Sequence, residues 1–283
     1  MRQKKPWLPG REGGSAMLER FRRAKKAEIT ALAALSAKGT MPPPFAGSRP
    51  SFAASLKTRA PLAVIAEYKR ASPSKGDINL AATPEQAAQA YAAAGAGAIS
   101  VLTEREYFKG DIGFLERMTA PGLPLLRKDF ILHPLQVEQT AAVPASALLL
   151  IVRMLDDPML RNLLRRCREL GLEAVAEVCD GDDLQRAQAA EASIIQVNNR
   201  DLDSLRVDLG LSRRLAACKR SGEFWITASG ISCREDLTGL LNLGFDAALV
   251  GSSLMEGGDL GQSLTVLLRG TSPLSKQKRE SDV

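Results

Sequence analysis

The stretch LAVIAEYKRASPSKGD at residues 62–77 joins an apolar run to a dense group of charged and hydroxyl side chains. Its first part, LAVIAEY, has the length and composition of a buried β-strand. The strand ends in Glu67 and Lys69, and both side chains project to one face because successive strand residues alternate between faces. A buried strand that ends in ionisable groups predicts a polar binding site at its carboxyl end.

Runs of the same type recur along the chain, and their starts lie 20 to 35 residues apart, about the length of one βα unit. Segments of helical periodicity separate them, such as TPEQAAQAYAAAG at 83–95, where Thr83 can cap the helix and Pro84 can occupy its first position. Eight such units predict an α/β fold, a closed (β/α)8 TIM barrel. We expect its strands at LAVIAEY (62–68), GAISVLT (97–103), LPLLRK (123–128), SALLLIV (146–152), EAVAEV (173–178), SIIQVN (193–198), EFWITA (223–228) and AALVG (247–251).

An open, doubly wound parallel sheet is the alternative architecture. In a dinucleotide-binding sheet of that kind, the first strand is followed by a GxGxxG turn, and residues 69–78 contain no such motif. The barrel is therefore the favoured prediction.

The barrel is expected to occupy residues 61–269. Residues 1–60 form an N-terminal helical extension and linker: MLERFRRAKKAEITALAALSA at 17–37 has helical periodicity, and a Pro/Gly-rich segment at 39–50 ends it. Residues 270–283 form a polar C-terminal tail, which we expect to be disordered.

Composition narrows the classes of partner. The net charge of +6 suits an anionic substrate or a nucleic acid, but much of the excess is near the termini and no nucleic-acid-binding motif accompanies it. The four cysteines form no CxxC pair and the chain has one histidine, so we expect no metal site. No apolar stretch reaches membrane-spanning length, which predicts a cytoplasmic protein with reduced thiols and no membrane partner.

Polar side chains gather at the predicted strand ends, where barrel enzymes carry their catalytic groups. Because ionisable residues follow three different strands, we expect them to share one cleft rather than form separate solvated pairs. The residues at these ends are Glu67 and Lys69, Arg127 and Lys128, Glu177, and Asn198, Asn199 and Arg200.

The last two predicted strands end differently, in the small-residue turns TASGIS (227–232) and VGSSLM (250–255). Turns of this kind expose backbone N–H groups ahead of a helix, and barrels often bind phosphate there. We predict an anion site at Ser229, Gly230, Gly251 and Ser252. His133 precedes Pro134 and is expected to start a helix rather than to act in catalysis.

The chain resembles the indole-3-glycerol phosphate synthases of tryptophan biosynthesis. The resemblance covers nearly the whole chain. It is carried by VIAEYKRASPSKGDI (64–78), LLRKDFIL (125–132), AEVCD (176–180), IIQVNNRDL (194–202), ASGIS (228–232) and LVGSSLM (249–255).

The resemblance implies a single-domain barrel with a helical segment over its mouth. It implies a carbon-carbon lyase that closes the indole ring of 1-(2-carboxyphenylamino)-1-deoxyribulose 5-phosphate with loss of carbon dioxide and water, without cofactor or metal. It also implies roles for individual residues: Lys128 as the acid at the ketone, Glu177 in proton transfer during dehydration, Glu67 and Lys69 as assisting groups, Ser72, Phe130, Asn198 and Arg200 in substrate binding, and Ser229, Gly230, Gly251 and Ser252 on the phosphate. We expect the protein to be a monomer. Whether it associates with other enzymes of the pathway is left open by the sequence.

Several positions depart from the family pattern. Ala228 stands where the family usually has glutamate, Gln196 where it commonly has glycine, Leu135 where it has tyrosine, and PASA (144–147) where it has GADA. Of these departures we expect only Ala228 to bear directly on chemistry. Thr227 does not replace the missing carboxylate, because adjacent strand residues face opposite sides.

Two other functions remain open from the sequence. One is another phosphosugar barrel such as phosphoribosylanthranilate isomerase, which the joint presence of EYKRASPSKG and RKDF disfavours. The other is a catalytically weak relative that binds a phosphosugar or serves as a subunit of a complex, an alternative motivated by Ala228.

Overall fold

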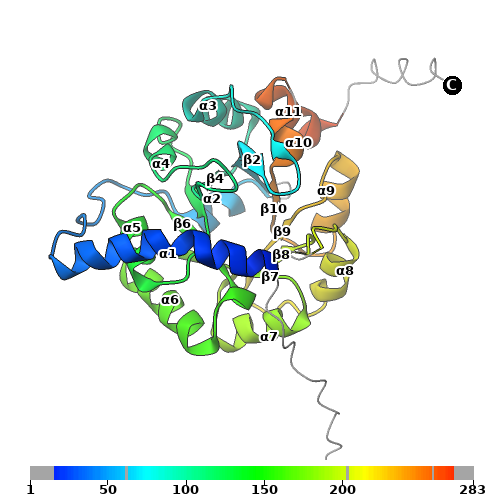
Figure 1. The fold of residues 1–283 in the computed structure, drawn as a ribbon. Helices are drawn as coiled ribbons and strands as arrows, with labels where there is room; N and C mark the ends of the chain where they lie inside the picture. The colour runs from blue at the N-terminus through cyan, green and yellow to red at the C-terminus, as the bar shows by residue number, and fades with distance from the viewer. Residues whose placement is uncertain (1–15, 61–62, 202–203, 257, 271–283) are drawn as a thin grey trace, which may run out of the picture.

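Eight parallel strands form a closed barrel in the computed structural model, which describes residues 16–60, 63–201, 204–256 and 258–270 (Figure 1). Strand β1 pairs with both β4 and β10, so the sheet has no free edge. The predicted barrel is confirmed, and the open doubly wound sheet is wrong. The strands are β1 (Ala63–Tyr68), β4 (Ala98–Leu102), β5 (Leu125–Lys128), β6 (Ala147–Ile151), β7 (Glu173–Val178), β8 (Ile194–Asn198), β9 (Phe224–Ala228) and β10 (Ala247–Val250).

Helices surround the strands and bury the outer face of the barrel. Helix α3 begins as the sequence predicts, with Thr83 accepting from the backbone of Gln86 and Pro84 in the first turn. The outer helices are α3 (Pro84–Ala94), α4 (Phe114–Arg117), α5 (Pro134–Ala141), α6 (Asp157–Glu169), α7 (Gly181–Ala189), α8 (Gly210–Ala216), α9 (Arg234–Leu241), α10 (Ser252–Met255) and α11 (Leu260–Arg269), with a 3-10 turn η1 at Val152–Met154.

The barrel interior is filled by aliphatic side chains rather than forming a pore. Ile65, Leu126 and Leu149 belong to one buried cluster that continues to the short helix α2 (Phe52–Lys57). Phe52 of this helix is fully buried. The helix therefore closes the amino-terminal end of the barrel and leaves the carboxyl end for the site.

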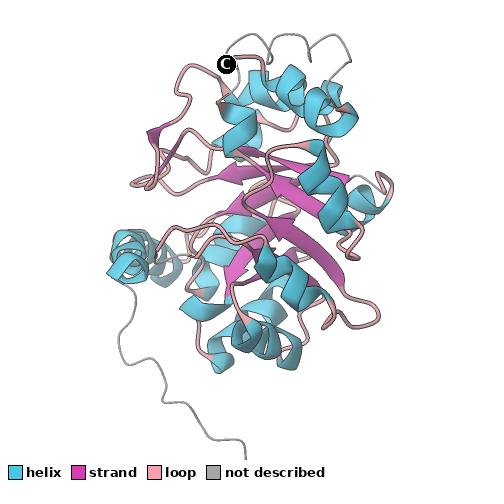
Figure 2. Cartoon of the chain, turned by 90° about the vertical axis from the view of Figure 1, so that its right-hand side faces the viewer, coloured by secondary structure: helices cyan, strands magenta, loops and turns pink. Residues whose placement is uncertain are grey.

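Helix α1 (Ala16–Ala37) lies across the carboxyl end of the strands, as Figures 1 and 2 both show. Its buried residues include Phe21, Lys25 and Leu32, and Arg22 donates a hydrogen bond of 2.6 Å to the carbonyl of Met154. The predicted helix is confirmed. The division into extension, barrel and tail stays a prediction, and residues 271–283 of the predicted tail lie outside the described residues.

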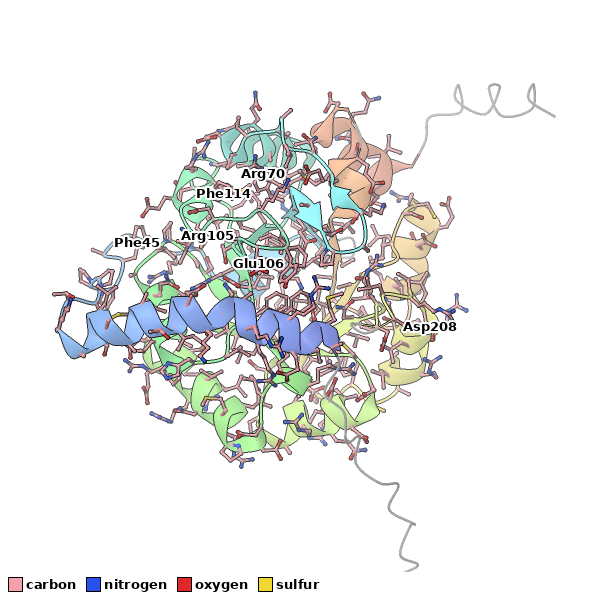
Figure 3. All side chains as sticks on the ribbon, in the orientation of Figure 1. Phe45, Arg70, Arg105, Glu106, Phe114 and Asp208 are labelled. Atoms are coloured by element: carbon pink, nitrogen blue, oxygen red, sulfur yellow. The ribbon has the colours of Figure 1, made fainter. Side chains whose placement is uncertain are left out.

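The segment after β1 folds into a small antiparallel hairpin of β2 (Ala71–Ser72) and β3 (Gly76–Asp77). Arg70 points away from the barrel axis, and its guanidinium lies 5.8 Å from the centre of the Phe114 ring (Figure 3). Among the described residues, no helix has the length and apolar character that a membrane crossing requires.

Candidate active site

A pocket opens at the carboxyl ends of the strands, and an adjoining hollow lies over the ends of β9 and β10. The structure brings to these two cavities all twelve residues to which the family resemblance assigns a role. Ten line the pocket: Glu67, Lys69, Ser72, Lys128, Phe130, Glu177, Asn198, Arg200, Ser229 and Ser252. Ser252 lines both cavities, and Gly230 and Gly251 line the hollow. The roles of these residues stay predictions.

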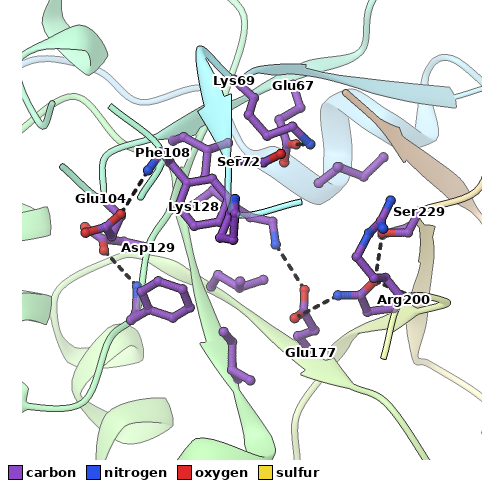
Figure 4. Close-up of a pocket in the computed structure, with 18 of the residues that line it drawn as sticks. Glu67, Lys69, Ser72, Glu104, Phe108, Lys128, Asp129, Glu177, Arg200 and Ser229 are labelled. Atoms are coloured by element: carbon purple, nitrogen blue, oxygen red, sulfur yellow. Dashed lines mark hydrogen bonds and ion pairs between the residues drawn. The ribbon is translucent and has the colours of Figure 1, made fainter. Parts of the chain in front are cut away.

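An ion pair crosses the pocket between strands β5 and β7 (Figure 4). The Lys128 ammonium lies 3.0 Å from Oε2 of Glu177. Asn198 donates to Oε1 of the same carboxylate at 3.2 Å, and Gln196 donates to Oε2 at 2.6 Å. Lys128 and Glu177 are therefore held in reach of each other and of any molecule in the pocket.

A second ion pair lies at the end of β1. The Lys69 ammonium is 3.0 Å from Oε1 of Glu67, and the Ser100 hydroxyl donates to Oε2 at 3.3 Å. Burial by itself raises the pKa of Glu67, but the charges of Lys69 and Lys128 outweigh it, and the pKa lies below its usual value. Glu67 is a carboxylate at neutral pH.

The same balance applies to Lys128. Burial lowers the pKa of an ammonium group, but the negative charges of Glu177 and Glu67 outweigh burial and raise the pKa of Lys128 above its usual value. Lys128 therefore keeps its proton at neutral pH. An ammonium group beside two carboxylates can act as a general acid and can be recharged by one of them.

The Asn198 side chain has one amide orientation, and it connects Glu177 in the pocket to Ser229, which lines both cavities. Its Oδ1 accepts from the Ser229 hydroxyl at 2.9 Å and from the backbone N–H of Arg200 at 3.0 Å, which leaves Nδ2 to donate to Glu177. The Arg200 side chain is steadied by a 2.8 Å hydrogen bond to the carbonyl of Leu205.

The turns after β9 and β10 form the hollow predicted to bind phosphate. Ser229 and Gly230 both have positive φ, 70° and 82°, and this conformation is favourable for glycine but strained for serine. At Gly251 a Cβ atom would lie 2.5 Å from Oε1 of Glu67, so only glycine fits beside that carboxylate. An ion pair between Lys75 of the β2–β3 hairpin and Glu256 crosses the rim.

Aromatic rings form the opposite wall of the pocket. Phe21 of helix α1 stacks on Phe130 with ring centres 4.1 Å apart, and Phe108 lies 6.2 Å from Phe130. The carboxylate of Glu104 accepts from the backbone N–H groups of residues 106–108 and so orders the loop that carries Phe108. This wall suits a flat, apolar ring.

Comparisons with known proteins agree with this geometry. The family model described as indole-3-glycerol phosphate synthase matches residues 18–267. A curated protein of that name from Roseiflexus sp. (strain RS-1) is 44% identical over 229 residues, covering 78% of this chain and 85% of the relative. The chain belongs to the indole-3-glycerol phosphate synthase family. A second relative of the same name, from Aquifex aeolicus (strain VF5), is 44% identical over 208 residues, 72% of this chain and 80% of its own.

Solved structures of low sequence identity share the fold. One titled "Crystal Structure of 3-Hexulose-6-Phosphate Synthase" has a TM-score of 0.57 at 14% identity and covers 75% of this chain and 99% of its own. Thiamine phosphate pyrophosphorylase from Pyrococcus furiosus has a TM-score of 0.54 at 18% identity, with 75% and 95% covered. At these identities the likeness extends to the barrel alone.

Two residues at the predicted strand ends do not reach the pocket of this synthase-family barrel. Arg127 is buried on the outer side of β5, where it donates to Thr140 and Gln139, because it alternates with the inward-facing Lys128. Asn199 likewise faces outward and donates to Thr227 at 3.1 Å. The interpretation of Arg127 and Asn199 as part of the shared cleft is therefore wrong.

His133 caps helix α5 by accepting from the backbone N–H of Leu135, as predicted for a helix-start residue. Among the described residues, no group of three or more His, Cys, Asp or Glu side chains could hold a metal ion.

The sequence analysis did not identify Phe21 and Phe108, which line the pocket, or Gln196, which is buried beside it and donates to Glu177. Gln196 carried a usable signal, because it lies two residues before Asn198 in a strand and so shares its face. Phe108 comes shortly after β4, but its position depends on the loop held by Glu104. No sequence signal identified Phe21 as a residue of the site, because helical periodicity does not predict where a helix packs on the barrel.

Ala228, where the synthase family usually has glutamate, lies at the end of β9 and lines the pocket. It stands beside Asn198 of β8 in the barrel register. The neighbouring Thr227 does not take the place of the missing glutamate, because its side chain faces outward, as predicted. The ionisable residues that line the pocket are Glu67, Lys69, Glu104, Lys128, Asp129, Glu177 and Arg200. Of these, Glu67, Lys69, Lys128 and Glu177 form the two ion pairs described above.

Proposed function

We propose that this pocket performs the reaction of its family with Lys128 and Glu177 as the central acid and base. The reaction is that of a decarboxylating lyase of tryptophan biosynthesis, which forms indole-3-glycerol phosphate from 1-(2-carboxyphenylamino)-1-deoxyribulose 5-phosphate. The observation that carries the proposal is the buried Lys128–Glu177 pair, 3.0 Å apart, between an aromatic wall and an anion-binding hollow.

The two cavities account for the two ends of this substrate. The phosphate binds at the turns of Ser229, Gly230, Gly251 and Ser252, where backbone N–H groups and small residues allow close approach. Lys69 and Arg200 line the hollow as well as the pocket and supply positive charge for anionic groups. The carboxyphenyl ring lies against Phe130, with Ser72 of the hairpin at the pocket's edge.

Ring closure needs an acid at the ketone. Lys128 gives its proton to the ketone oxygen while the ring carbon that bears the carboxylate attacks the ketone carbon. Carbon dioxide then leaves, and its bonding electrons restore the aromatic ring. The raised pKa of Lys128 keeps the acid charged until substrate binds. The arylamine supplies the nucleophilic carbon, so this route requires no cofactor.

Dehydration completes the indole. The hydroxyl formed from the ketone leaves as water after protonation, and the neighbouring methylene loses a proton to form the second ring double bond. Glu177 exchanges the protons of this step, because it lies beside Lys128 and can return a proton to it. Glu67 and Lys69 assist by holding charge and orienting the substrate.

Steady-state turnover of the carboxyphenylamino substrate, followed by indole fluorescence, tests this proposal. We expect turnover in the wild type and its loss in Lys128→Ala, with substrate binding retained in both. Binding without turnover in the wild type would instead favour the alternative that Ala228 suggests, a phosphosugar-binding barrel with weak or no catalysis.

We further propose a cytoplasmic monomer. The four cysteines are all free, which suits a reducing compartment. Light scattering at micromolar concentration tests the monomer, and co-purification with other tryptophan-pathway enzymes would reveal an association.

A further inference from the structure

Gln196 is a buried polar side chain inside the barrel, directly behind the central carboxylate. It lies in β8 opposite Glu177 of β7, and its exposed fraction is 0%. Its Nε2 donates to Oε2 of Glu177 at 2.6 Å, the shortest of the hydrogen bonds and ion pairs made by that carboxylate. A hydrogen bond of this length to a charged acceptor is a strong one.

The two oxygens of Glu177 are held differently. Oε2 accepts from both Lys128 and Gln196, whereas Oε1 accepts from Asn198, at 3.2 Å, and from no other side chain in the part of the chain that the structure describes. Gln196 and Asn198 come from one face of the same strand, two residues apart, so their amides reach the carboxylate from successive layers of the barrel. This arrangement fixes the direction in which Oε1 points.

We propose that Gln196 is a positioning residue that holds Oε2 of Glu177 in place and leaves Oε1 as the atom that exchanges protons with the substrate. The inference rests on the proposed roles of Lys128 and Glu177. When Lys128 turns to the ketone oxygen it no longer donates to Oε2. Gln196 then remains as the donor on that oxygen, so the carboxylate keeps its orientation through the step in which its partner leaves.

The orientation of the Gln196 amide supports a functional rather than a stabilising role. With Nε2 on the carboxylate, the amide oxygen Oε1 of Gln196 has no hydrogen-bond partner among the described residues. A buried acceptor without a partner lowers stability, and an apolar side chain of the same shape avoids that cost. A residue that costs stability while contacting a central carboxylate fits the trade-off found at functional sites.

Gln196→Met tests the proposal, because methionine keeps the length of the side chain and removes the donor. We expect kcat to fall about 10- to 100-fold with KM within about twofold, since the effect is on proton transfer after binding. The melting temperature should stay the same or rise. An unchanged kcat would overturn the proposal, and so would a loss of kcat that accompanies a fall in melting temperature and a rise in KM.

The chain offers a matched control. Gln188 is also buried and donates to a carboxylate, that of Glu223, at 3.0 Å, but it lies outside the pocket, on helix α7, where it contacts the segment before β9. Gln188→Met should lower the melting temperature and leave kcat within about twofold. If Gln196→Met and Gln188→Met behave alike, Gln196 has only a structural role.

A second readout asks whether Gln196 acts through Glu177. In a Glu177→Gln background, Gln196→Met should change kcat less than about twofold, because the group that it positions is already gone. An undiminished effect in that background would overturn the proposal. Wild-type turnover and its loss in Lys128→Ala test the proposed function separately, so a failure of this inference is distinguishable from a failure of the function.

Discussion

Two clusters of four charges lie on opposite sides of strand β5, and each contains two cations and two anions. The inner cluster, in the pocket, consists of Glu67, Lys69, Lys128 and Glu177. The outer cluster, between the barrel and helix α1, consists of Lys25, Glu28, Arg127 and Asp129. Arg127, Lys128 and Asp129 are consecutive in the sequence. Arg127 and Lys128 alternate in β5 and so belong to different clusters, whereas Asp129 follows the strand and pairs with Lys25 and Arg127 although it also borders the pocket.

The outer cluster is closed by neutral partners. Arg127 donates from Nη1 to the Gln136 carbonyl, the Gln139 side chain and the Thr140 hydroxyl, and Asp129 accepts from Thr103. The Lys25 ammonium lies 2.6 Å from Asp129, which ties helix α1 to the strand. A network with so many partners holds its charges in place.

The inner cluster leaves capacity for a ligand. The contrast lies in the cations: 17% of the Lys128 side chain and 15% of the Lys69 side chain are accessible, against 4% for Lys25 and 1% for Arg127. Among the outer charges, the Glu28 carboxylate is the exposed one, at 27%. The comparison teaches that similar sets of charges can have different roles. Charges whose hydrogen-bonding groups are satisfied by neutral partners stabilise the fold, whereas charges that border a cavity are available for chemistry. Matched substitutions of one lysine from each cluster test this.

Lys128→Met has the largest expected effect. We expect kcat to fall by at least about 1000-fold, or roughly 4 kcal/mol of transition-state stabilisation, because the acid at the ketone is lost. The unfolding free energy should change by less than that, since this lysine borders a cavity. Single-turnover fluorescence and urea unfolding measure the two quantities. A larger loss of stability than of activation free energy would break the comparison.

Lys25→Met should show the reverse. Removing the cation leaves Asp129 buried with one charged partner fewer, and we expect the unfolding free energy to fall by about 3 kcal/mol. The kcat should stay within about tenfold of wild type. The exposed neighbour Lys26 supplies the control, because Lys26→Met should leave both quantities near wild type. A loss of activity in Lys25→Met that exceeds its loss of stability would place the outer cluster in the chemistry.

The outer cluster also predicts a pH dependence of stability. Burial raises the pKa of Asp129, but the charges of Arg127 and Lys25 outweigh burial and lower the pKa to about 2. A carboxyl whose pKa is lower in the folded than in the unfolded state stabilises above the unfolded value of about 4 and loses this stabilisation as the pH falls toward 2.

Asp129→Asn removes this titration. The difference in unfolding free energy between wild type and variant should therefore be largest at neutral pH and narrow by roughly 1 kcal/mol at about pH 3. Urea unfolding at the two pH values measures it. A difference that stays constant with pH would show that the Asp129 charge contributes nothing beyond its hydrogen bonds.

Strand alternation also marks how far the sequence reaches. The eight strands follow from short apolar runs at regular intervals, and the carboxyl ends of those runs supply Glu67, Lys128 and Glu177, because closing a barrel brings all strand ends together. Applied to RKD at 127–129, the same alternation would have separated Arg127 from Lys128. Arg127 was misplaced because all polar residues at a strand end were assigned to the cleft, without regard to the face on which each side chain lies.

Other features depend on tertiary packing that the sequence does not encode locally. Helix α1 is evident from periodicity, but the stacking of Phe21 on Phe130 requires knowing how the helix crosses the barrel. The Gln196–Glu177 contact requires the register of β7 against β8, and register follows from barrel closure rather than from either strand alone.

Ala228→Glu has the smallest expected effect and changes the charge balance of the inner cluster. A carboxylate here would adjoin Asn198 and face the substrate, so as an assisting group it should raise kcat about tenfold. It would also give a neutral cluster a net negative charge, and repulsion of an anionic substrate should raise KM. Steady-state fluorescence at low ionic strength separates kcat from KM.

Ala228→Gln is the control for this substitution, because it matches the size of glutamate without its charge. It should raise neither kcat nor KM if the carboxylate is what matters. If kcat does not rise in Ala228→Glu, the site functions without a carboxylate at position 228. Glu177, which Gln196 and Asn198 hold in place, then carries out the proton transfers alone. In that case, Ala228 keeps the inner cluster neutral, and the two clusters on β5 differ in openness rather than in charge.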